Sequence, residues 1–186
     1  MATEISRRLF TVDDYHRMAD AGILSQRDRV ELIYGEVLAM SPSGPRHGAW
    51  VDRAAQVMFN ITRARAIVRV QGNVGLDEYD EPQPDIVLLR PKDDFYFSKL
   101  PSPSDILLII EVADSSLEYD RTIKARLYAE TGIQEYWVMD LRNDRLFAYS
   151  NPSGKSYGIV RELHRGDVIA PQLLSECRIE IAALLL

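Results

Sequence analysis

The chain has 186 residues, of which 46% are hydrophobic and 27% charged, and its formal net charge is −6. This length suits one domain with a full core and is too short for two, and no apolar run approaches the roughly 20 residues of a membrane span. Phosphate contacts need Lys and Arg, so the acidic balance argues against a broad, charge-driven nucleic-acid surface.

Cysteine and histidine usage narrows the metal chemistry. Cys177 is the only cysteine, which excludes an internal disulfide and a thiolate zinc cluster. The three histidines, His16, His47 and His164, lie far apart and lack zinc-ligand spacing. Residues 1–8 lack the apolar core of a signal peptide, so we expect a cytoplasmic protein.

The first elements are a helix and a hairpin. Thr11 is a typical N-cap, acids follow in the first turn, and Gly22 is a stop signal, which together predict a helix over residues 11–21. Alternating residues over 29–40 predict a hairpin that turns at Gly35.

A loop over 41–45 and a first long helix over 47–63 follow, the helix indicated by apolar residues at helical spacing. Arginines recur through and beyond this helix with only Asp52 opposing them. Two interpretations stay open, a solvated helix surface or a local basic face. The arginines are Arg46, Arg53, Arg63, Arg65 and Arg69.

The middle of the chain predicts four strands and a second helix. Apolar runs indicate the strands, and Gly132 ends a helix that begins at a capping-box pattern over 115–118. A polar, Pro-rich insert separates the second and third strands. The ranges are strands 66–74, 85–89, 106–112 and 135–140, helix 116–131 and insert 90–105.

The C-terminal part predicts two antiparallel strands, 144–149 and 158–163, joined around a turn at 152–154, and a short terminal helix within 179–186. Together the elements predict an α/β or α+β fold with a mixed central sheet flanked by helices. We expect a single domain over residues 1–186. Its core spans about 47–141, with a helix and hairpin over 11–40 and a hairpin and tail over 142–186.

Three residues carry the chemistry. Asp85 opens one apolar strand, Glu111 lies late in another, and a carboxylate in such a run is costly to bury unless it is paired or binds a metal. Lys124 follows on the next helix, within reach of the same point, with Asp120 four residues earlier to hold it. Two carboxylates suit Mg²⁺, and the set provides what metal-assisted phosphodiester hydrolysis needs.

Each residue also has a simpler interpretation. Asp85 alone is compatible with a turn cap after Pro84, and Lys124 alone with a solvated lysine paired to Asp120. Glu111 is harder to explain in this way, because the five residues before it are all apolar. The three together, in this order and in these elements, are less expected by chance than each one alone.

Several segments resemble a known family. Pro84-Asp85, Glu111 in a strand and Lys124 on the next helix look like the PD-(D/E)XK nuclease superfamily. The chain is more closely similar to the Uma-type restriction endonuclease family, over the segments 30–36, 83–85, 110–112, 120–124 and 128–140. The resemblance spans nearly the whole chain. It implies a restriction-endonuclease-like core and a metal-dependent nuclease site at Asp85, Glu111 and Lys124, with Asp85 and Glu111 as ligands of Mg²⁺ or Mn²⁺.

The chain departs from the superfamily pattern in two ways. The lysine usually stands two residues after the acid, where this sequence has Ala113, so Lys124 must reach the site from the helix. The first long helix, which often carries an acid, has only Asp52. Glu31 or His47 are therefore candidates to complete the site, against simpler roles as a hairpin residue and a helix start.

Other side chains invite a choice of roles. Gln71 is a weaker site candidate, because its strand is expected beside the acid-bearing ones, and a structural role is favoured. Tyr136 and Trp137 are expected to pack in the core or at an interface. The aromatic residues at 95–97 suit base stacking or a dimer contact, and the acidic charge favours the dimer contact.

The leading hypothesis is a Mg²⁺- or Mn²⁺-dependent endonuclease that cuts DNA by water attack at phosphorus, as a homodimer whose paired sites cut both strands. The alternative is a catalytically silent nuclease fold that serves as a binding or regulatory module. A third possibility is hydrolysis of a smaller phosphoester, which would need no broad basic face.

Overall fold

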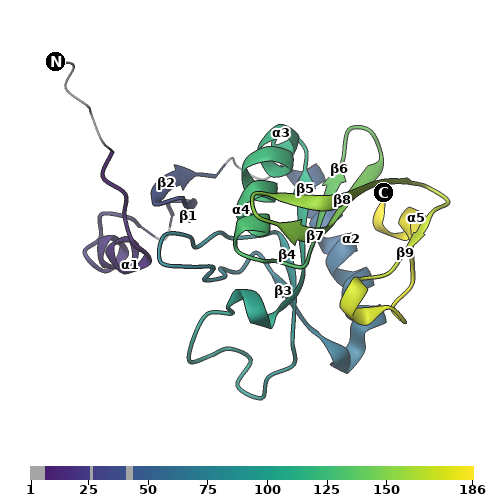
Figure 1. Ribbon diagram of the computed structural model, residues 1–186, viewed down its shortest axis with the longest axis horizontal. Coiled ribbons are helices and arrows are strands. Elements are labelled where there is room, and N and C mark those ends of the chain that lie inside the picture. Colours follow the sequence, from purple (N-terminus) through teal and green to yellow (C-terminus); the bar gives the residue numbers. More distant parts are fainter. Residues whose placement is uncertain (1–6, 26, 41–43) are drawn as a thin grey trace.

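Figure 1 shows a computed structural model of the chain, which describes residues 7–25, 27–40 and 44–186. A π-helical turn, Asp120–Lys124, joins the helix α3 (Leu117–Tyr119) to the helix α4 (Ala125–Glu130). The helices and strands are α1 (Val12–Asp20), β1 (Val30–Ile33), β2 (Glu36–Ala39), α2 (Pro45–Thr62), β3 (Ile67–Val70), β4 (Ile86–Leu89), β5 (Ile106–Ala113), α3 (Leu117–Tyr119), α4 (Ala125–Glu130), β6 (Glu135–Asp140), β7 (Arg145–Ser153), β8 (Ser156–His164), β9 (Val168–Ile169), β10 (Ile179–Glu180) and α5 (Ile181–Leu184).

The centre of the molecule is a six-stranded mixed sheet in the order β3-β4-β5-β6-β7-β8. Only the pair β5 and β6 is parallel, and every other neighbouring pair in this sheet is antiparallel. The parallel pair requires a crossover, which α3, the π turn and α4 provide. The predicted α+β class with a mixed central sheet is confirmed.

Helices cover both faces of this sheet. Successive strand residues point to opposite faces, and every residue of β5 is buried, which requires cover on both sides. One face packs against α2 and α5, with Trp50 and Met58 of α2 in the core. The other face packs against α4, where Tyr128 and Tyr136 meet edge to face with ring centroids 4.9 Å apart.

The N-terminal elements form where the sequence indicates them. The Thr11 hydroxyl accepts from the Asp14 N–H at 3.1 Å, and the Asp14 carboxylate accepts from the Thr11 N–H at 3.3 Å, which is a complete capping box. Strands β1 and β2 pair across a turn at Gly35, whose φ of +71° favours glycine. The predicted helix and hairpin are confirmed.

The start of α2 differs slightly from its prediction. The helix begins at Pro45 rather than His47, because proline suits the first helical turn, where its missing N–H has no partner to lose. Of the loop predicted over 41–45, residues 41–43 lie outside the described ranges.

The helix after β5 has a different beginning from the one predicted. The capping box at 115–118 is wrong, because the Ser116 hydroxyl donates to Asp120 Oδ2 at 2.6 Å instead of capping the first turn. The helical segment then runs through the π turn to Glu130, and Gly132, with a φ of +77°, follows its end. The predicted stop signal is thus correct.

The C-terminal strands are longer than predicted. Strand β7 reaches Ser153 and β8 begins at Ser156, so the turn lies at Gly154 and Lys155 rather than over 152–154. Both strands extend the central sheet. The tail forms the short strand β10 before the four-residue helix α5, so the predicted terminal helix occupies only part of 179–186.

The arginines in and after α2 bind groups of the protein itself. Arg46 donates to the Leu141 carbonyl at 2.5 Å and Arg53 to the Ala183 carbonyl at 2.8 Å. Arg65 pairs with Glu176 at 2.9 Å, and Arg69 donates to the Phe95 carbonyl at 3.2 Å. These contacts tie α2 and β3 to later parts of the chain, so the four side chains are not a uniform basic face.

The aromatic residues at 95–97 lie partly at the surface and partly in the interior of the protein. Phe95 and Phe97 are exposed, but Tyr96 is buried and donates through its hydroxyl to the Arg90 carbonyl at 2.8 Å. Trp137 and Tyr136 are fully buried, as expected for core residues.

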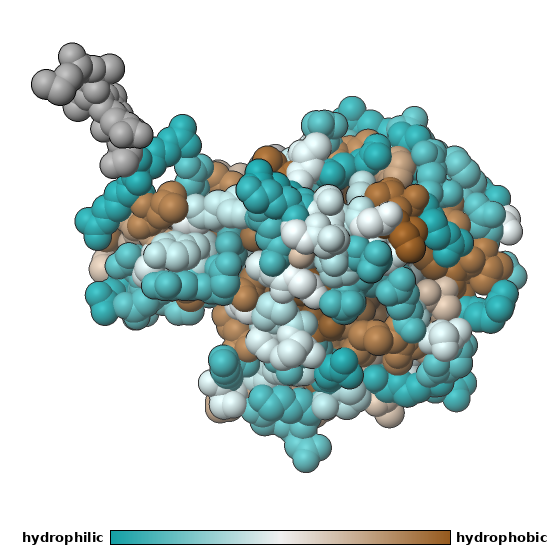
Figure 2. Space-filling view, in the orientation of Figure 1, coloured by the Kyte–Doolittle hydropathy of each residue, from teal (hydrophilic) through white to brown (hydrophobic). Residues whose placement is uncertain are grey.

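On the face seen in Figure 2, hydrophilic and hydrophobic residues are interspersed. Within the described ranges, no helix has both the length and the apolar character needed to cross a membrane.

Asp80 makes the anchoring of the β1–β2 hairpin sensitive to pH. Its buried carboxylate accepts from the Tyr34 N–H in the hairpin turn. Burial, with Asp77 close by, raises the pKa of Asp80 to about 7. Between the unfolded value of about 3.9 and this pKa, the folded chain binds more protons than the unfolded one. The associated stability is therefore present at low pH and lost as pH rises through about 7.

We expect Asp80→Asn to remove this contribution. The fall in Tm between about pH 5 and about pH 8 should be smaller in the variant than in the wild type, because Asn carries no titrating proton. Thermal unfolding followed by circular dichroism measures it. Asp93→Asn, at an exposed position, is the control and should keep the wild-type slope. A wild-type slope in Asp80→Asn would contradict the assignment.

Candidate active site

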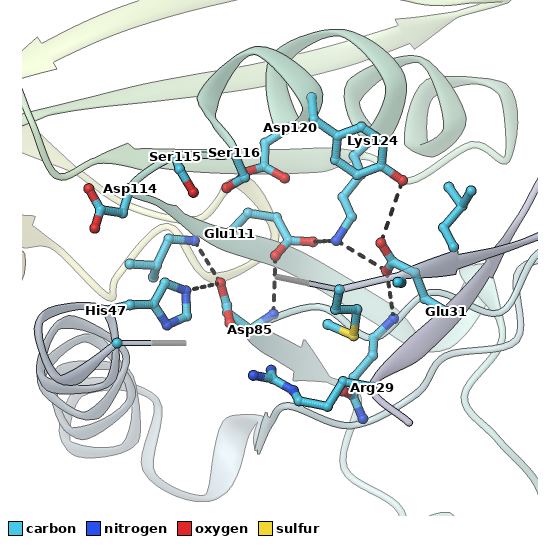
Figure 3. Close-up of a pocket in the computed structure, with 17 residues that line it drawn as sticks. Arg29, Glu31, His47, Asp85, Glu111, Asp114, Ser115, Ser116, Asp120 and Lys124 are labelled. Carbon is cyan, nitrogen blue, oxygen red and sulfur yellow. Dashed lines mark hydrogen bonds and ion pairs between the residues drawn. The ribbon is translucent and has the colours of Figure 1, made fainter. Parts of the chain in front are cut away.

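A cavity of about 490 Å³ lies between the β1–β2 hairpin, the start of α2, the adjoining ends of β4 and β5, and the start of the α3 helical segment. Figure 3 shows charged side chains from all these elements pointing into it. Asp85, Glu111 and Lys124, the three residues singled out in the sequence, all line this cavity.

Sheet pairing brings the two acids together. Ile86 pairs with Ile110 across the antiparallel strands β4 and β5, which places Asp85 beside Glu111. The Asp85 N–H donates to Glu111 Oε2 at 3.2 Å, and the Val112 N–H donates to Asp85 Oδ2 at 2.9 Å. Backbone groups therefore fix both carboxylates at one point of the cavity.

Lys124 reaches the same point from the π turn. Its Nζ lies 2.9 Å from Glu111 Oε1 and 3.2 Å from Glu31 Oε2, and the lysine is only 4% exposed. The hydroxyl of the fully buried Tyr128 donates to the same Glu111 oxygen at 3.0 Å. The ammonium is thus held between two carboxylates, one from the central sheet and one from the hairpin.

The expected Asp120–Lys124 pair does not form. Asp120 lines the cavity, but the ion pairs found for Lys124 in the described part of the chain are with Glu31 and Glu111. The physical reason is the π turn, in which the Ala125 N–H bonds to the Asp120 carbonyl, five residues back. The extra residue moves positions four apart out of the row that they share on an α-helix.

His47 and Glu31, the two candidates for completing the site, are both present. His47 Nε2 lies 3.1 Å from Asp85 Oδ2, and its Nδ1 is buried without a hydrogen-bond partner in the described structure. The hydrogen bond to Asp85 raises the pKa of His47. Glu31 is 4% exposed and also accepts from the Gln83 N–H at 3.3 Å.

Gln71 has a different position. Its side chain is exposed and does not line the cavity, because β3 ends at Val70 and Gln71 takes a φ of +48°. Its N–H donates to the Asp85 carbonyl at 2.9 Å, so it holds the backbone of that residue. The structural role favoured for it is the one observed.

The sequence interpretation missed Tyr128 and Arg29. Tyr128 stands one helical turn after Lys124, and that spacing was the available signal for a second contact to Glu111. Arg29 lines the cavity from just before β1 and had no pattern of its own. Glu31 was undervalued although it stands between Val30 and Leu32 in a strand, the same signal that singled out Glu111.

More acidic than basic side chains line the cavity. Burial raises the pKa of Glu111 to about 8, although Lys124 acts in the opposite direction, and burial raises the pKa of Asp120 to about 6. Burial would also raise the pKa of Asp85, but the His47 hydrogen bond and charge keep it below the ordinary value. Glu111 and Glu31 raise the pKa of Lys124 despite burial, so its ammonium persists at neutral pH.

This donor set fits a hard divalent cation. Mg²⁺ takes one or two protein carboxylates and keeps several waters, and Asp85 and Glu111 provide two adjoining carboxyl groups in a lining that is rich in acidic side chains. In the described residues, no three His, Cys, Asp or Glu side chains form a group that could hold a metal ion. Asp85 and Glu111 would therefore hold the ion, with water as its other ligands.

Comparison with known proteins gives a consistent picture. The family model Uma2, described as "Putative restriction endonuclease", matches residues 12–183. Among solved structures, the chain is similar to "a putative nuclease belonging to DUF820" from Anabaena variabilis, with a TM-score of 0.73 and 16% identity over 94% of this chain and 97% of the other. That likeness shows the fold. No curated protein matches the chain. Because the family model covers nearly its whole length, the chain belongs to the Uma2 family.

Proposed function

We propose that this chain is a Mg²⁺- or Mn²⁺-dependent endonuclease that hydrolyses DNA phosphodiester bonds, with Asp85, Glu111 and Lys124 as its catalytic residues. The single observation that supports it most is the meeting of the partly buried Asp85 carboxylate with the buried Glu111 carboxylate and Lys124 ammonium, at one end of a nuclease-like sheet. Nuclease family membership points to the same chemistry.

The residues have distinct roles in this proposal. A divalent cation held by Asp85 and Glu111 would polarise the scissile phosphate and acidify the attacking water. The Lys124 ammonium orients that water and stabilises the charge that builds on the phosphate oxygens. Glu31 and Tyr128 hold Lys124 and Glu111 in place, and His47 holds Asp85. Arg29 offers positive charge to the incoming phosphate from the hairpin wall.

We further propose that the chain acts as a homodimer, since two-fold symmetry pairs two sites on the two strands of DNA. The exposed Phe95 and Phe97 are candidates for the contact. The second candidate function is a catalytically silent binding module, which the acidic net charge of −6 and the internally bound arginines favour.

Metal removal tests the proposal. Purified protein and supercoiled plasmid are incubated with Mg²⁺, with Mn²⁺, or with EDTA, and the nicked and linear forms are measured on a gel. We expect nicking with either metal and none with EDTA, because water attack needs the cation. Nicking that survives EDTA would contradict the metal dependence. Metal binding by calorimetry without any nicking would favour the silent module.

A further inference from the structure

Described segments of the chain line the candidate active site from three sides. The β1–β2 hairpin stands on one side, the start of α2 with His47 on another, and the turn through Ser116 on a third, with Asp85 and Glu111 between them. The ion pair between Glu31 and Lys124 ties the hairpin to the helical segment across the cavity. The hairpin wall is therefore fixed to the catalytic residues themselves.

The reacting groups lie deep inside these walls. Glu111 is 3% exposed, and the side chains of Asp85 and His47 are 13% and 15% exposed. A phosphate must therefore enter the cavity to reach both acids. The cavity has a volume of about 490 Å³. A single strand can bend one phosphate into this space, whereas a duplex brings its paired strand with it and is stiff, with a persistence length of about 150 bp.

Apolar and aromatic side chains in the lining of the cavity suit contact with an unpaired base. Leu38, Ala39 and Met40 line the hairpin side, and Tyr119 lines the helical side. Methionine adapts to irregular apolar surfaces, and unpaired bases stack on aromatic rings. A divalent cation on the acidic groups would attract a phosphate inward, and the apolar side chains of the hairpin would then contact a base that is free of its partner.

Building on the nuclease function proposed above, we propose that this site takes a single-stranded stretch of DNA, as an end, a flap or an unpaired bubble, in preference to intact duplex. A flexible strand can bend its backbone into the cavity and place one base against the apolar wall. A duplex must first open. Each base-pair step opened costs about 1.4 kcal/mol, which is a factor of about ten.

Binding is measured separately from cleavage, so that the preference for single strands and the nuclease function are tested independently. A labelled oligonucleotide, alone or annealed to its complement, is titrated with the wild-type protein in Ca²⁺, and fluorescence anisotropy gives Kd. We expect the single strand to bind at least about tenfold more tightly. Charge density alone would favour the duplex, with one charge per about 1.7 Å of axis. Equal or tighter binding of duplex would overturn the inference, whatever the cleavage result.

A variant of the apolar wall tests the same point at one residue. Met40→Ala should weaken single-strand binding severalfold and raise KM for single-stranded substrate with little change in kcat. The substitution keeps the backbone hydrogen bond from the Met40 N–H to the Arg29 carbonyl and removes only the apolar side chain. Leu173→Ala removes a similarly apolar, exposed side chain on the C-terminal segment and should bind as the wild type does. Equal Kd values for Met40→Ala and wild type would count against a base at this wall. Tight single-strand binding without cleavage in Mg²⁺ would instead reject the nuclease function alone.

Discussion

Replacing Asp85 by Asn is expected to reduce metal-dependent DNA cleavage by at least about 100-fold while leaving the fold in place. Changes to groups that only support a metal ligand typically cost about 10- to 100-fold, and Asn removes the charge of a proposed ligand itself. The amide oxygen can still accept the Val112 N–H, which now bonds to Asp85 at 2.9 Å. The strand end should therefore keep its shape.

The measurement is the initial rate of plasmid nicking in Mg²⁺, beside the affinity for Mn²⁺ from calorimetry. Both should fall together, because the same carboxylate serves both. Asp52→Asn is the matched control, an exposed acid on α2, the helix that carries His47. Unchanged nicking by Asp85→Asn would place the catalytic centre elsewhere and remove the main support for the proposed function.

Sequence periodicity predicted most of the sheet because burial on both faces leaves a strong pattern. Strand 135–140 has the predicted bounds, and β5 extends its prediction by one residue. Strand β3 is shorter than its predicted range of 66–74 because Gln71 turns out of the sheet with a positive φ. Gly72 and Asn73, both common turn residues, follow Gln71 and are the local signal that the strand prediction passed over. The Asp85 carbonyl, just before β4, accepts the Gln71 N–H at this turn.

The candidate site was predictable where one strand carries the signal and not where distant segments meet. Glu111 is conspicuous inside an apolar run. Glu31 sits in a short hairpin strand, and only the folded chain reveals that its carboxylate faces Lys124. The π turn likewise has no local signature, yet it decides that Lys124 pairs with Glu111 and Glu31 rather than with Asp120. Tertiary contacts, not propensity, set these partners.

Lys124→Met should give the largest loss of stability of any single substitution at this site. Methionine fills a similar volume, but Glu31 and Glu111 are left as buried carboxylates without their shared ammonium. Removing one partner of a buried pair typically costs about 3–5 kcal/mol. We expect a loss of that size in the free energy of unfolding by urea, together with loss of nicking.

The loss should also depend on pH in a defined direction. Burial raises the pKa of Glu111 and the Lys124 ammonium opposes that shift. Without the ammonium the pKa of Glu111 rises further, so the folded variant binds a proton that the unfolded chain releases. The free energy of unfolding of the variant is therefore highest at low pH and falls as pH rises. The deficit relative to wild type should therefore be smaller at about pH 5 than at about pH 8. A deficit that is the same at both values would mean that the carboxylates are paired by other groups.

Neutralising all three residues separates stability from catalysis. In the triple variant Lys124→Met, Glu31→Gln, Glu111→Gln, no buried charge is left unpaired by the lysine change, and replacing a whole buried ion pair by neutral groups is often close to neutral for stability. We expect the triple variant to regain most of the unfolding free energy and none of the nicking. Recovered nicking would show that the buried charges serve the fold alone. Recovered stability without nicking would show that the three charged side chains act in DNA cleavage, because the neutral replacements would then meet every structural requirement.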